Sequence, residues 1–363
     1  MIISGGGTGG HIFPAVAIAN ELKRVNVENE ILFVGAEGRM EMEKVPAAGY
    51  NIVGLKIAGI QRKFDFKNFI LPFKVLGSVI KSRNIIREFN PQAVVGVGGY
   101  ASGPLLYAAT MMRIPSLIQE QNSFAGVTNK ILSKRVQKVC VAYDRMGIYF
   151  PADKIVLTGN PVRQDVINIE GKKTEAIKYF NIDPFKKTIL VIGGSLGARS
   201  INEAIKTGLG KLVEQHIQLV WQTGKHFFSN AKEVAGEFEA NGIRVHDFIS
   251  RMDLAYSCAD VVVSRAGASS VSELELVAKP CILVPSPNVA EDHQTKNAMA
   301  LVTKNAAILV RDSEAGGMLI DAAISLVKDT EKQMSLSQNI SKLALRNSAE
   351  KIVEEIYKMI TKK

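Results

Sequence analysis

Three glycine-rich turns constrain the fold of this chain more than any other feature of its sequence. They occupy residues 5–11, 96–103 and 193–199, and each lies between a short apolar run and a segment with helical periodicity. A strand that enters a helix through such a turn can direct backbone N–H groups and the positive end of the helix toward a phosphate. Two such turns in the first half and one in the second predict that the chain handles more than one diphosphate, as a transferase with a nucleotide donor and a phosphorylated acceptor would.

The apolar runs predict buried parallel strands, because they are short, continuous and rich in valine and isoleucine. The predicted strands cover residues 31–35, 93–97, 116–119, 138–142, 155–157, 188–192, 217–222, 243–248, 261–264, 281–284 and 307–310. Their alternation with helical segments predicts an α/β fold of two Rossmann-like parallel-sheet domains facing across a cleft, with the boundary near Pro161. Apolar side chains at helical spacing over residues 348–363 predict an amphipathic helix that must pack on another element.

Length and composition agree with two domains, since 363 residues with 47% hydrophobic content can bury sizeable cores. No apolar run reaches the roughly 18 residues of a transmembrane helix. The first turn follows Met1 so closely that we expect no signal peptide, and the short first strand predicts that a few native residues are missing. The cysteines, Cys140, Cys258 and Cys281, lack the spacing of metal ligands and suit a reducing compartment.

Positive charge is concentrated in the first half of the chain. The net charge is +10, of which residues 1–161 contribute +8 and residues 162–363 contribute +2. Such an excess suits a nucleic acid, an anionic membrane or a phosphorylated substrate. We expect no nucleic-acid partner, because no zinc-finger or RNA-recognition signature accompanies the charge.

Aromatic and basic residues alternate within residues 60–89, and this pattern predicts a surface that binds an anionic membrane. Apolar rings can enter the headgroup layer while the cations meet anionic lipid. The residues predicted to form this patch are Lys63, Phe64, Phe66, Lys67, Phe69, Phe73 and Lys74. The alternative is an ordinary helix with a basic, solvated face.

The first turn admits more than one chemistry. Gly5, Gly7 and Gly10 match the spacing of a dinucleotide-binding fingerprint, and Glu28, Glu30 and Glu37 lie in roughly the region of a ribose-binding acid. The first turn alone therefore does not exclude the function of a nicotinamide-dependent oxidoreductase. His11 follows the last glycine, where its imidazole can accept a proton from a hydroxyl nucleophile as a general base. The alternative is that His11 only caps the helix.

Polar residues after other predicted strands are further candidates for ligand binding. Ser102 adds a hydroxyl donor to the second turn, and residues 120–122 follow a strand, where side chains of open α/β sheets face the ligand. In the second half, Glu273 can accept hydrogen bonds from both hydroxyls of a ribose, although a lone helical glutamate is commonly solvated. No Asp-x-Asp motif is present, so we expect no metal cofactor and assign charge neutralisation to backbone N–H groups, helix ends and Arg163.

The motifs together resemble the MurG family, the peptidoglycan N-acetylglucosaminyltransferases of glycosyltransferase family 28. The segments that carry the resemblance, in order and spacing along nearly the whole chain, are residues 5–15, 96–104, 120–122, 159–163, 193–199 and 264–273. The resemblance implies a GT-B fold whose C-terminal helix packs back on the N-terminal domain. It also implies an acceptor- and membrane-binding domain of residues 1–161 plus 345–363, and a UDP-GlcNAc-binding domain of residues 162–344.

The resemblance further implies an activity and a location. N-acetylglucosamine would pass with inversion from UDP-GlcNAc to the muramyl C4 hydroxyl of lipid I, which is undecaprenyl-diphospho-muramoylpentapeptide, to form lipid II. The enzyme would be peripheral to the cytoplasmic face of the bacterial inner membrane, without a cofactor. Its partners would be the two substrates and the anionic membrane surface, with proteins of cell-wall synthesis and division as candidates.

Site residues carry over by position, with His11 as the base. The donor-binding residues implied are Thr8, Gly9, Gly10, Asn122, Arg163, Ser195, Ile249, Ala268, Ser269, Ser270, Val271, Ser272, Glu273 and Gln294. The acceptor diphosphate would meet Gly7, Gly98, Gly99, Tyr100, Ser102 and Gly103. Leu196 and His293 depart from the glutamines that some family members carry, which puts sugar contacts in doubt.

Other functions explain fewer of these features. A related GT-B transferase that glycosylates diacylglycerol would share the fold and the membrane patch, but residues 98–104 and 120–122 favour the peptidoglycan acceptor. A UDP-N-acetylglucosamine epimerase would need no basic apolar surface. An oxidoreductase would use only the first turn, and a non-catalytic nucleotide-binding module would have no use for His11.

Overall fold

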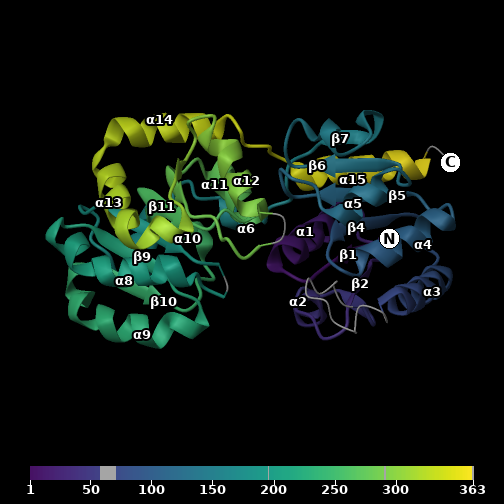
Figure 1. Cartoon of the computed structure of the whole chain (residues 1–363), viewed down its shortest axis with the longest axis horizontal. Coiled ribbons are helices and arrows are strands. Elements are labelled where there is room, and N and C mark those ends of the chain that lie inside the picture. The colour runs from purple at the N-terminus through teal and green to yellow at the C-terminus, as the bar shows by residue number, and fades with distance from the viewer. Residues whose placement is uncertain (58–70, 195, 290–291, 362–363) are drawn as a thin grey trace. The chain divides into compact units, whose positions relative to one another are not determined.

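The chain folds into two compact units. The structure is a computed structural model that describes residues 1–57, 71–194, 196–289 and 292–361 (Figure 1). One unit comprises Met1–Arg163 with Leu345–Lys363, and the other comprises Gln164–Ala344. The chain thus enters the second unit after Arg163 and returns to the first at Leu345.

A seven-stranded parallel sheet organises the described part of the first unit, in the order β3-β2-β1-β4-β5-β6-β7. Its strands are β1 (Ile2–Gly5), β2 (Leu32–Ala36), β3 (Asn51–Leu55), β4 (Val94–Gly98), β5 (Ser116–Glu120), β6 (Lys138–Val141) and β7 (Ile155–Leu157). The strand order reverses between β1 and β4, and ligands of open parallel sheets bind at such a switch point. The first two glycine turns follow these two strands.

Helices cover both faces of this sheet, because neighbouring residues of each strand point to opposite sides. The helices are α1 (Gly9–Val25), α2 (Glu41–Ala47), α3 (Leu71–Phe89), α4 (Ser102–Met111), α5 (Val127–Ser133) and α15 (Ser348–Thr361). Ile2 and Val94 pack in a core with α3, α4 and α5, whereas the adjacent Ile3 and Val95 pack in a core with α1, α2 and α15.

The second unit repeats this plan with a six-stranded parallel sheet in the order β10-β9-β8-β11-β12-β13. Its strands are β8 (Thr188–Ile192), β9 (Gln218–Gln222), β10 (Ile243–His246), β11 (Val261–Ser264), β12 (Cys281–Leu283) and β13 (Ile308–Leu309). The switch point here lies between β8 and β11, which precede the turns at residues 193–199 and 265–267.

Two helical layers again cover the sheet. The helices are α6 (Gln164–Ile167), α7 (Lys173–Phe180), α8 (Arg199–Glu214), α9 (Lys225–Ala235), α10 (Met252–Cys258), α11 (Ala268–Val277), α12 (His293–Val302), α13 (Ala315–Lys328) and α14 (Thr330–Ser341). Leu190 and Val262 face a core that includes α10, α11 and α12, and Val191 and Val263 face a core that includes α8, α9 and α13.

The predicted α/β fold with two parallel sheets is confirmed, and the predicted strands are found with ends that differ by one or two residues at most. The prediction missed β3, an edge strand that is only partly buried and that Gly54 interrupts. The prediction included a short first strand but gave no bounds for it, and the structure places β1 at Ile2–Gly5. The predicted C-terminal helix is α15, and it packs on the first unit through Ile352, Val353 and Ile356.

Candidate active site

The two glycine turns of the first unit touch at the switch point of its sheet. The Gly6 N–H donates to the Gly98 carbonyl oxygen over 3.3 Å. Gly99 has a φ of +90°, and a Cβ on it would lie 2.5 Å from the Gly6 carbonyl oxygen. Only glycine accepts this backbone angle and this close approach without strain. The turns therefore form one continuous backbone surface at the ends of β1 and β4.

His11 is held against this surface in a defined orientation. Its Nδ1 lies 2.9 Å from the Gly6 carbonyl oxygen and 3.4 Å from the Thr8 hydroxyl. A carbonyl oxygen only accepts, so we assign the proton of the neutral ring to Nδ1 and the lone pair to Nε2. The ring packs over Gly98, where a Cβ would lie 2.6 Å from the ring carbon Cδ2. The structure thus presents a half-buried imidazole whose tautomer suits a general base.

Glu41 supports the first turn through hydrogen bonds from its carboxylate, and nothing in the sequence indicated this role. Its side chain is buried, and its carboxylate oxygens accept the Gly7 N–H over 2.8 Å and the Ala36 N–H over 3.0 Å. A Cβ on Gly6 would collide with this carboxylate. The sequence carries no local signal for the contact, since Glu41 and Gly7 are separated by 34 positions.

This carboxylate bears on two interpretations of the first turn. Gly7 was expected to bind the acceptor diphosphate, but its N–H is already bonded to Glu41. A dinucleotide pyrophosphate on this turn would likewise meet the buried negative charge. Of the acids considered for a ribose, Glu28 and Glu30 precede β2 and therefore lie toward the wrong end of the sheet, and Glu37 pairs with Lys81 over 3.2 Å.

The second turn also differs from expectation at Ser102. Its hydroxyl is buried and lies 2.9 Å from the Gly98 carbonyl oxygen and 3.0 Å from that of Ser4. The hydroxyl therefore ties the turn to β1 and does not face a ligand, which corrects its predicted role as a side-chain donor. Tyr100 is exposed, with the Arg39 guanidinium 5.7 Å from its ring centre.

The polar residues at the end of β5 and directly after it comprise two buried side chains, Glu120 and Gln121, and the half-buried Asn122. Glu120 is buried, and its carboxylate accepts from Asn129 over 2.8 Å and from the Gly126 N–H over 3.1 Å. Gln121 is buried and donates to the Val97 carbonyl oxygen. The expectation that these two side chains face a ligand is therefore wrong, because they bind the protein itself. Asn122 is half-buried, and its predicted sugar contact stays a prediction.

Arg163 ends the first stretch of the first unit. Its side chain is exposed, and its guanidinium lies 5.7 Å from the centre of the Phe13 ring on α1. Phe13 in turn lies over Gly9, where a Cβ would be 3.0 Å from the ring. The predicted donor-phosphate cation is therefore beside the turn that carries His11.

In the second unit, the turn after β8 packs tightly against the turn after β9, which contains Gly224. Gly197 and Gly224 have φ angles of +80° and +77°, and a Cβ on Gly224 would lie 2.6 Å from the Gly197 Cα. Ser195, predicted to contact the donor phosphates, lies outside the described residues. Leu196, where some family members carry glutamine, is 70% exposed.

The start of α11 offers backbone donors for an anion. Gly267 precedes it with extended angles, φ −67° and ψ 145°, and no side chain caps the helix. The N–H groups of its first residues, Ala268, Ser269 and Ser270, have no partner within the helix, and the helix dipole adds positive potential there. The first turn carries no acidic residue that would oppose an anion. These properties suit the predicted binding of a diphosphate.

Glu273 lies two helical positions beyond this first turn and is half-buried. Its Oε2 accepts a hydrogen bond from the Tyr256 hydroxyl over 2.8 Å. Burial, with the nearby Glu273 carboxylate, raises the pKa of Tyr256 well above its usual value, so the phenol stays protonated. Tyr256 is a residue that sequence reasoning missed, because a tyrosine in an apolar helix gives no sign of its partner.

Ile249 and Gln294 are both held by short contacts. The Ile249 N–H donates to Gln222 Oε1 over 2.9 Å, and Gln222 Nε2 donates to the Gly194 carbonyl oxygen over 3.2 Å. Gln222 therefore links the predicted uracil-binding backbone to the turn after β8, a connection that the sequence did not reveal. Gln294 is the second residue of α12, and its Oε1 accepts from the Ser286 N–H over 2.9 Å.

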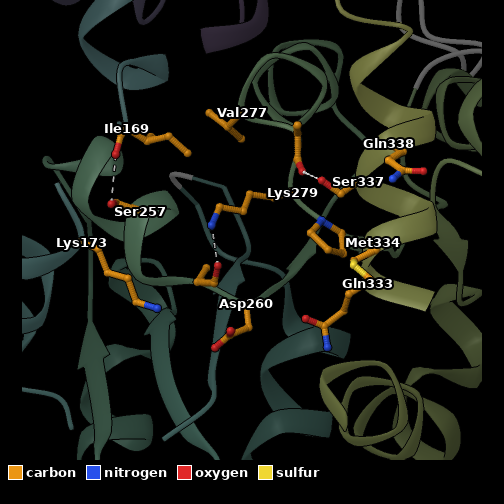
Figure 2. A pocket seen from close by; sticks show the side chains of 13 residues that line it. Ile169, Lys173, Ser257, Asp260, Val277, Lys279, Gln333, Met334, Ser337 and Gln338 are labelled. Carbon is orange, nitrogen blue, oxygen red and sulfur yellow. Dashed lines mark hydrogen bonds between the residues drawn. The ribbon is translucent and has the colours of Figure 1, made fainter. Parts of the chain in front are cut away.

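A pocket of about 520 Å³ lies at the other end of this sheet, where Asp260 and Pro280 directly precede β11 and β12 (Figure 2). Its polar side chains are largely engaged within the fold: Lys279 donates to the Ala259 carbonyl oxygen over 2.7 Å, and Ser257 donates to that of Ile169 over 3.2 Å. The pocket is separate from the glycine turns, which follow the carboxyl ends of the strands.

The predicted membrane patch falls mostly outside the described residues, which do not include Lys63, Phe64, Phe66, Lys67 and Phe69. Phe73 and Lys74 belong to α3, but their side chains are also outside the description. Among the residues that are described, no helix has both the length and the apolar character to cross a membrane. In the same part of the chain, no three His, Cys, Asp or Glu side chains gather in a group able to hold a metal ion.

Apolar side chains are exposed on three neighbouring helices of the first unit. They are Leu76 and Ile80 on α3, Tyr107 and Met111 on α4, and Val127 and Ile131 on α5. In the first unit of Figure 1, α3 packs against α4 and α4 packs against α5. Arg135 lies among them, 5.1 Å from the Tyr107 ring centre. We call these side chains the α3–α5 face.

Two parallel-sheet units with glycine turns at their switch points define a two-domain glycosyltransferase fold of the GT-B type. The model of the glycosyltransferase family 28 N-terminal domain matches residues 1–141, and that of the family 28 C-terminal domain matches residues 188–356. The chain therefore belongs to glycosyltransferase family 28.

Curated relatives match over the full length. One from Phocaeicola vulgatus is 58% identical over 100% of this chain and 96% of its own, and one from Parabacteroides distasonis is 56% identical over 100% and 99%. Both are named UDP-N-acetylglucosamine--N-acetylmuramyl-(pentapeptide) pyrophosphoryl-undecaprenol N-acetylglucosamine transferase. The crystal structure of MurG from Acinetobacter baumannii is 28% identical, covers 99% of each chain and has a TM-score of 0.80.

Proposed function

We propose that this protein transfers N-acetylglucosamine from UDP-GlcNAc to the muramyl C4 hydroxyl of lipid I, which produces lipid II and UDP. The observation that carries the proposal is the 56% identity, over the whole chain, to a relative named for this transfer. The start of α11 supports it, because its backbone N–H groups suit an anionic donor, and the first glycine turn supports it by orienting His11 as a candidate base.

His11 would act as the general base. Nε2 takes the proton of the acceptor C4 hydroxyl while its oxygen attacks C1 of N-acetylglucosamine from the face opposite UDP. The bond between C1 and the phosphate oxygen breaks, and its electron pair leaves with UDP. The configuration at C1 is therefore inverted, and the new linkage is β-1,4. The resulting imidazolium keeps its Nδ1–H bond to the Gly6 carbonyl oxygen, which stabilises the positive charge.

The donor would be held mainly by the second unit. The N–H groups at the start of α11 would meet the diphosphate end of the nucleotide, with Val271 and Ser272 following in the same helix. Glu273 would accept from the ribose hydroxyls. Ile249 would contact uracil through its backbone. Arg163 and Ser195 would meet the donor phosphates.

The sugar and the acceptor would meet backbone-rich surfaces. Thr8, Gly9, Gly10, Asn122 and Gln294 are the residues proposed near N-acetylglucosamine. On the acceptor side, the turn of Gly98, Gly99 and Tyr100 and the start of α4 with Gly103 would face the lipid I diphosphate through N–H groups. Ser102 would contribute through its backbone only.

We also propose that the first unit binds the cytoplasmic face of the bacterial inner membrane as a peripheral protein. Its excess of basic residues and the exposed apolar side chains of the α3–α5 face support this location. Ile80→Glu together with Ile131→Glu should reduce sedimentation with vesicles that contain anionic lipid and leave turnover on a short-chain acceptor unchanged. Equal vesicle binding would contradict the proposal. The proteins of cell-wall synthesis and division stay candidate partners.

UDP release tests the reaction. The protein is mixed with UDP-GlcNAc and a lipid I analogue, with UDP-glucose as the donor control and diacylglycerol as the acceptor control. We expect release that needs both UDP-GlcNAc and the lipid I analogue. Release with diacylglycerol alone would favour the glycolipid transferase, and NADH fluorescence enhancement on mixing would favour an oxidoreductase.

A further inference from the structure

We propose that Tyr256 is a positioning residue, whose hydroxyl sets the orientation of the Glu273 carboxylate toward the ribose of the donor. This inference rests on the proposed function, because it needs Glu273 to bind the ribose. It adds a residue that touches no substrate and acts through another side chain.

The contact joins a buried donor to a half-buried acceptor. Tyr256 is 1% exposed, and its hydroxyl lies 2.8 Å from Glu273 Oε2. A glutamate side chain has three rotatable bonds, and a fixed partner restricts the orientations of its carboxylate. An ionised carboxylate has about four lone-pair sites, so it can accept from Tyr256 and from other donors at the same time.

The phenol is suited to this task because it always donates. Burial and the adjacent negative charge both raise the pKa of Tyr256, so it does not ionise in the range where the enzyme works. A hydroxyl that donates to a carboxylate forms a charge-assisted hydrogen bond, which is stronger than a neutral one. This hydrogen bond therefore favours one orientation of the carboxylate before a nucleotide arrives.

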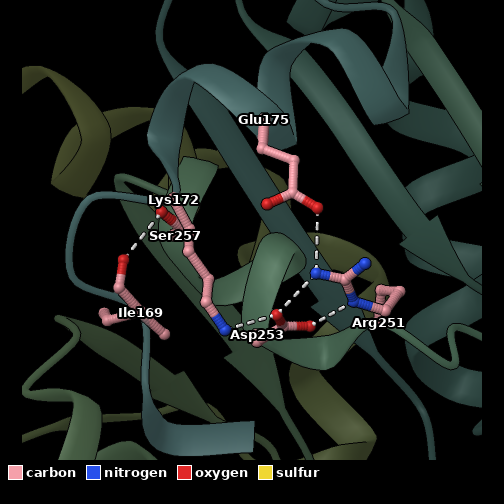
Figure 3. Close-up of polar contacts among 6 residues, drawn as sticks. All are labelled: Ile169, Lys172, Glu175, Arg251, Asp253 and Ser257. Carbon is pink, nitrogen blue, oxygen red and sulfur yellow. Dashed lines mark hydrogen bonds and ion pairs between the residues drawn. The ribbon is translucent and has the colours of Figure 1, made fainter. Parts of the chain in front are cut away.

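The helix that carries Tyr256 is itself anchored near both ends (Figure 3). At its start, Asp253 accepts from Arg251 over 2.9 Å and 3.0 Å and from Lys172 over 2.8 Å, and Arg251 also pairs with Glu175 over 3.0 Å. These cations hold the pKa of the nearly buried Asp253 well below its usual range.

Near the other end of α10, the Ser257 hydroxyl donates to the Ile169 carbonyl oxygen over 3.2 Å (Figure 3). The helix is short, so contacts near both ends restrict the position of each residue between them. The backbone of Tyr256 is thus held on both sides. A displacement of the α10 backbone would require these contacts to break.

The experiment compares nucleotides with and without ribose hydroxyls. Binding of UDP and of 2′,3′-dideoxy-UDP is measured by calorimetry for the full chain, for Tyr256→Phe and for Glu273→Gln. Tyr256→Phe should weaken UDP binding about three- to tenfold, since a hydrogen bond to a charged group is lost from the carboxylate that binds the ribose. Its affinity for dideoxy-UDP should be unchanged, and Tyr50→Phe, which removes a tyrosine hydroxyl bond in the first unit, should change neither.

The outcomes separate this inference from the proposed function. If Glu273→Gln loses UDP affinity selectively but Tyr256→Phe does not, or if Tyr256→Phe weakens both nucleotides equally, the positioning role is overturned. If Glu273→Gln itself binds both nucleotides like the full chain, the ribose role of Glu273 fails, and the inference fails with it. The double variant should lose no more than Glu273→Gln alone, and an additive loss would also contradict the coupling.

Discussion

Each unit places a glutamate carboxylate at a glycine turn or at the helix that follows one, and the two carboxylates have different partners. Glu41 in the first unit is 1% exposed and accepts two backbone N–H groups of the protein itself. Glu273 in the second unit is half-buried and accepts from one phenol on a neighbouring helix. The first carboxylate shapes a turn, and the second is the one that we propose to bind the ribose.

The difference agrees with the proposal that the first unit carries the base and the second binds the nucleotide. In the first unit an internal carboxylate takes an N–H that a phosphate would otherwise use, and the turn instead supports His11. In the second unit the start of α11 carries no acid, and its glutamate lies further along the helix. We therefore expect changes in the first unit to affect rate or folding, and changes in the second to affect nucleotide affinity.

The largest effect should follow from His11→Ala. Loss of the general base should lower kcat about 10²- to 10⁴-fold, with little change in UDP affinity. Steady-state UDP release measures the rate, and calorimetry measures the affinity. His226→Ala, an exposed histidine of α9, is the control. An unchanged kcat would contradict the assignment of His11 as the general base.

Glu41→Ala should destabilise the first unit without a specific loss of nucleotide binding. It leaves the buried N–H of Ala36 without its acceptor, at a cost of about 1–3 kcal/mol in the free energy of unfolding, and it removes the acceptor of the part-buried Gly7 N–H as well. Urea unfolding measures this change. Glu43→Ala, two positions away with a side chain 78% exposed, should be nearly neutral. Equal stability of the two variants would contradict the supporting role of Glu41.

Gly98→Ala should disturb both the turn and the imidazole. The added Cβ would require an alanine at φ +108° and would lie 2.6 Å from the His11 ring, so we expect about 1–3 kcal/mol lower stability and a reduced kcat. Gly77→Ala in α3 is the matched control, since nothing lies within 4 Å of its Cβ and helical glycine is unfavourable. Wild-type turnover in Gly98→Ala would show that the position of the His11 ring over Gly98 is not required for catalysis.

The smallest effect concerns Glu275, which lies on the same helix as Glu273. Burial raises its pKa to about 8 from 4.5, with partial opposition from Lys304. Because the folded state binds this proton more tightly than the unfolded state, the resulting stability is present below pH 4.5 and is lost as the pH rises through 8.

The variant Glu275→Gln should therefore melt at the same temperature as the wild type at pH 5 and a few degrees higher at pH 9. Thermal unfolding at both pH values measures the difference. An equal advantage at both values would mean that packing, and not ionisation, explains the effect.

Features with local sequence signals were predictable. The buried strands and the glycine turns recur with fixed neighbours, and most of the parallel order follows from them. Strand β3 was missed because Gly54 breaks its apolar run and its side chains are only partly buried. The C-terminal helix was predictable from its spacing, and its packing on the first unit followed from the family resemblance.

The supporting contacts of the site were not predictable in the same way. Glu41 and Gly7 are 34 positions apart, and Tyr256 and Glu273 are 17 apart, so tertiary folding alone brings them together. Glu120 illustrates the opposite error. A polar residue at the end of a parallel strand predicts a ligand contact, but here the loop that follows uses the carboxylate for its own N–H groups.

The return of the chain to the first unit through α15 sets an order of events on the ribosome. Ile352, Val353 and Ile356 complete a core with α1, yet they are translated after the whole of Gln164–Ala344. The second unit therefore has all its core residues available while one face of the first sheet still lacks its final cover. During that interval the nascent chain exposes apolar surface, and chaperones that bind such surface would recognise the first unit longer than the second.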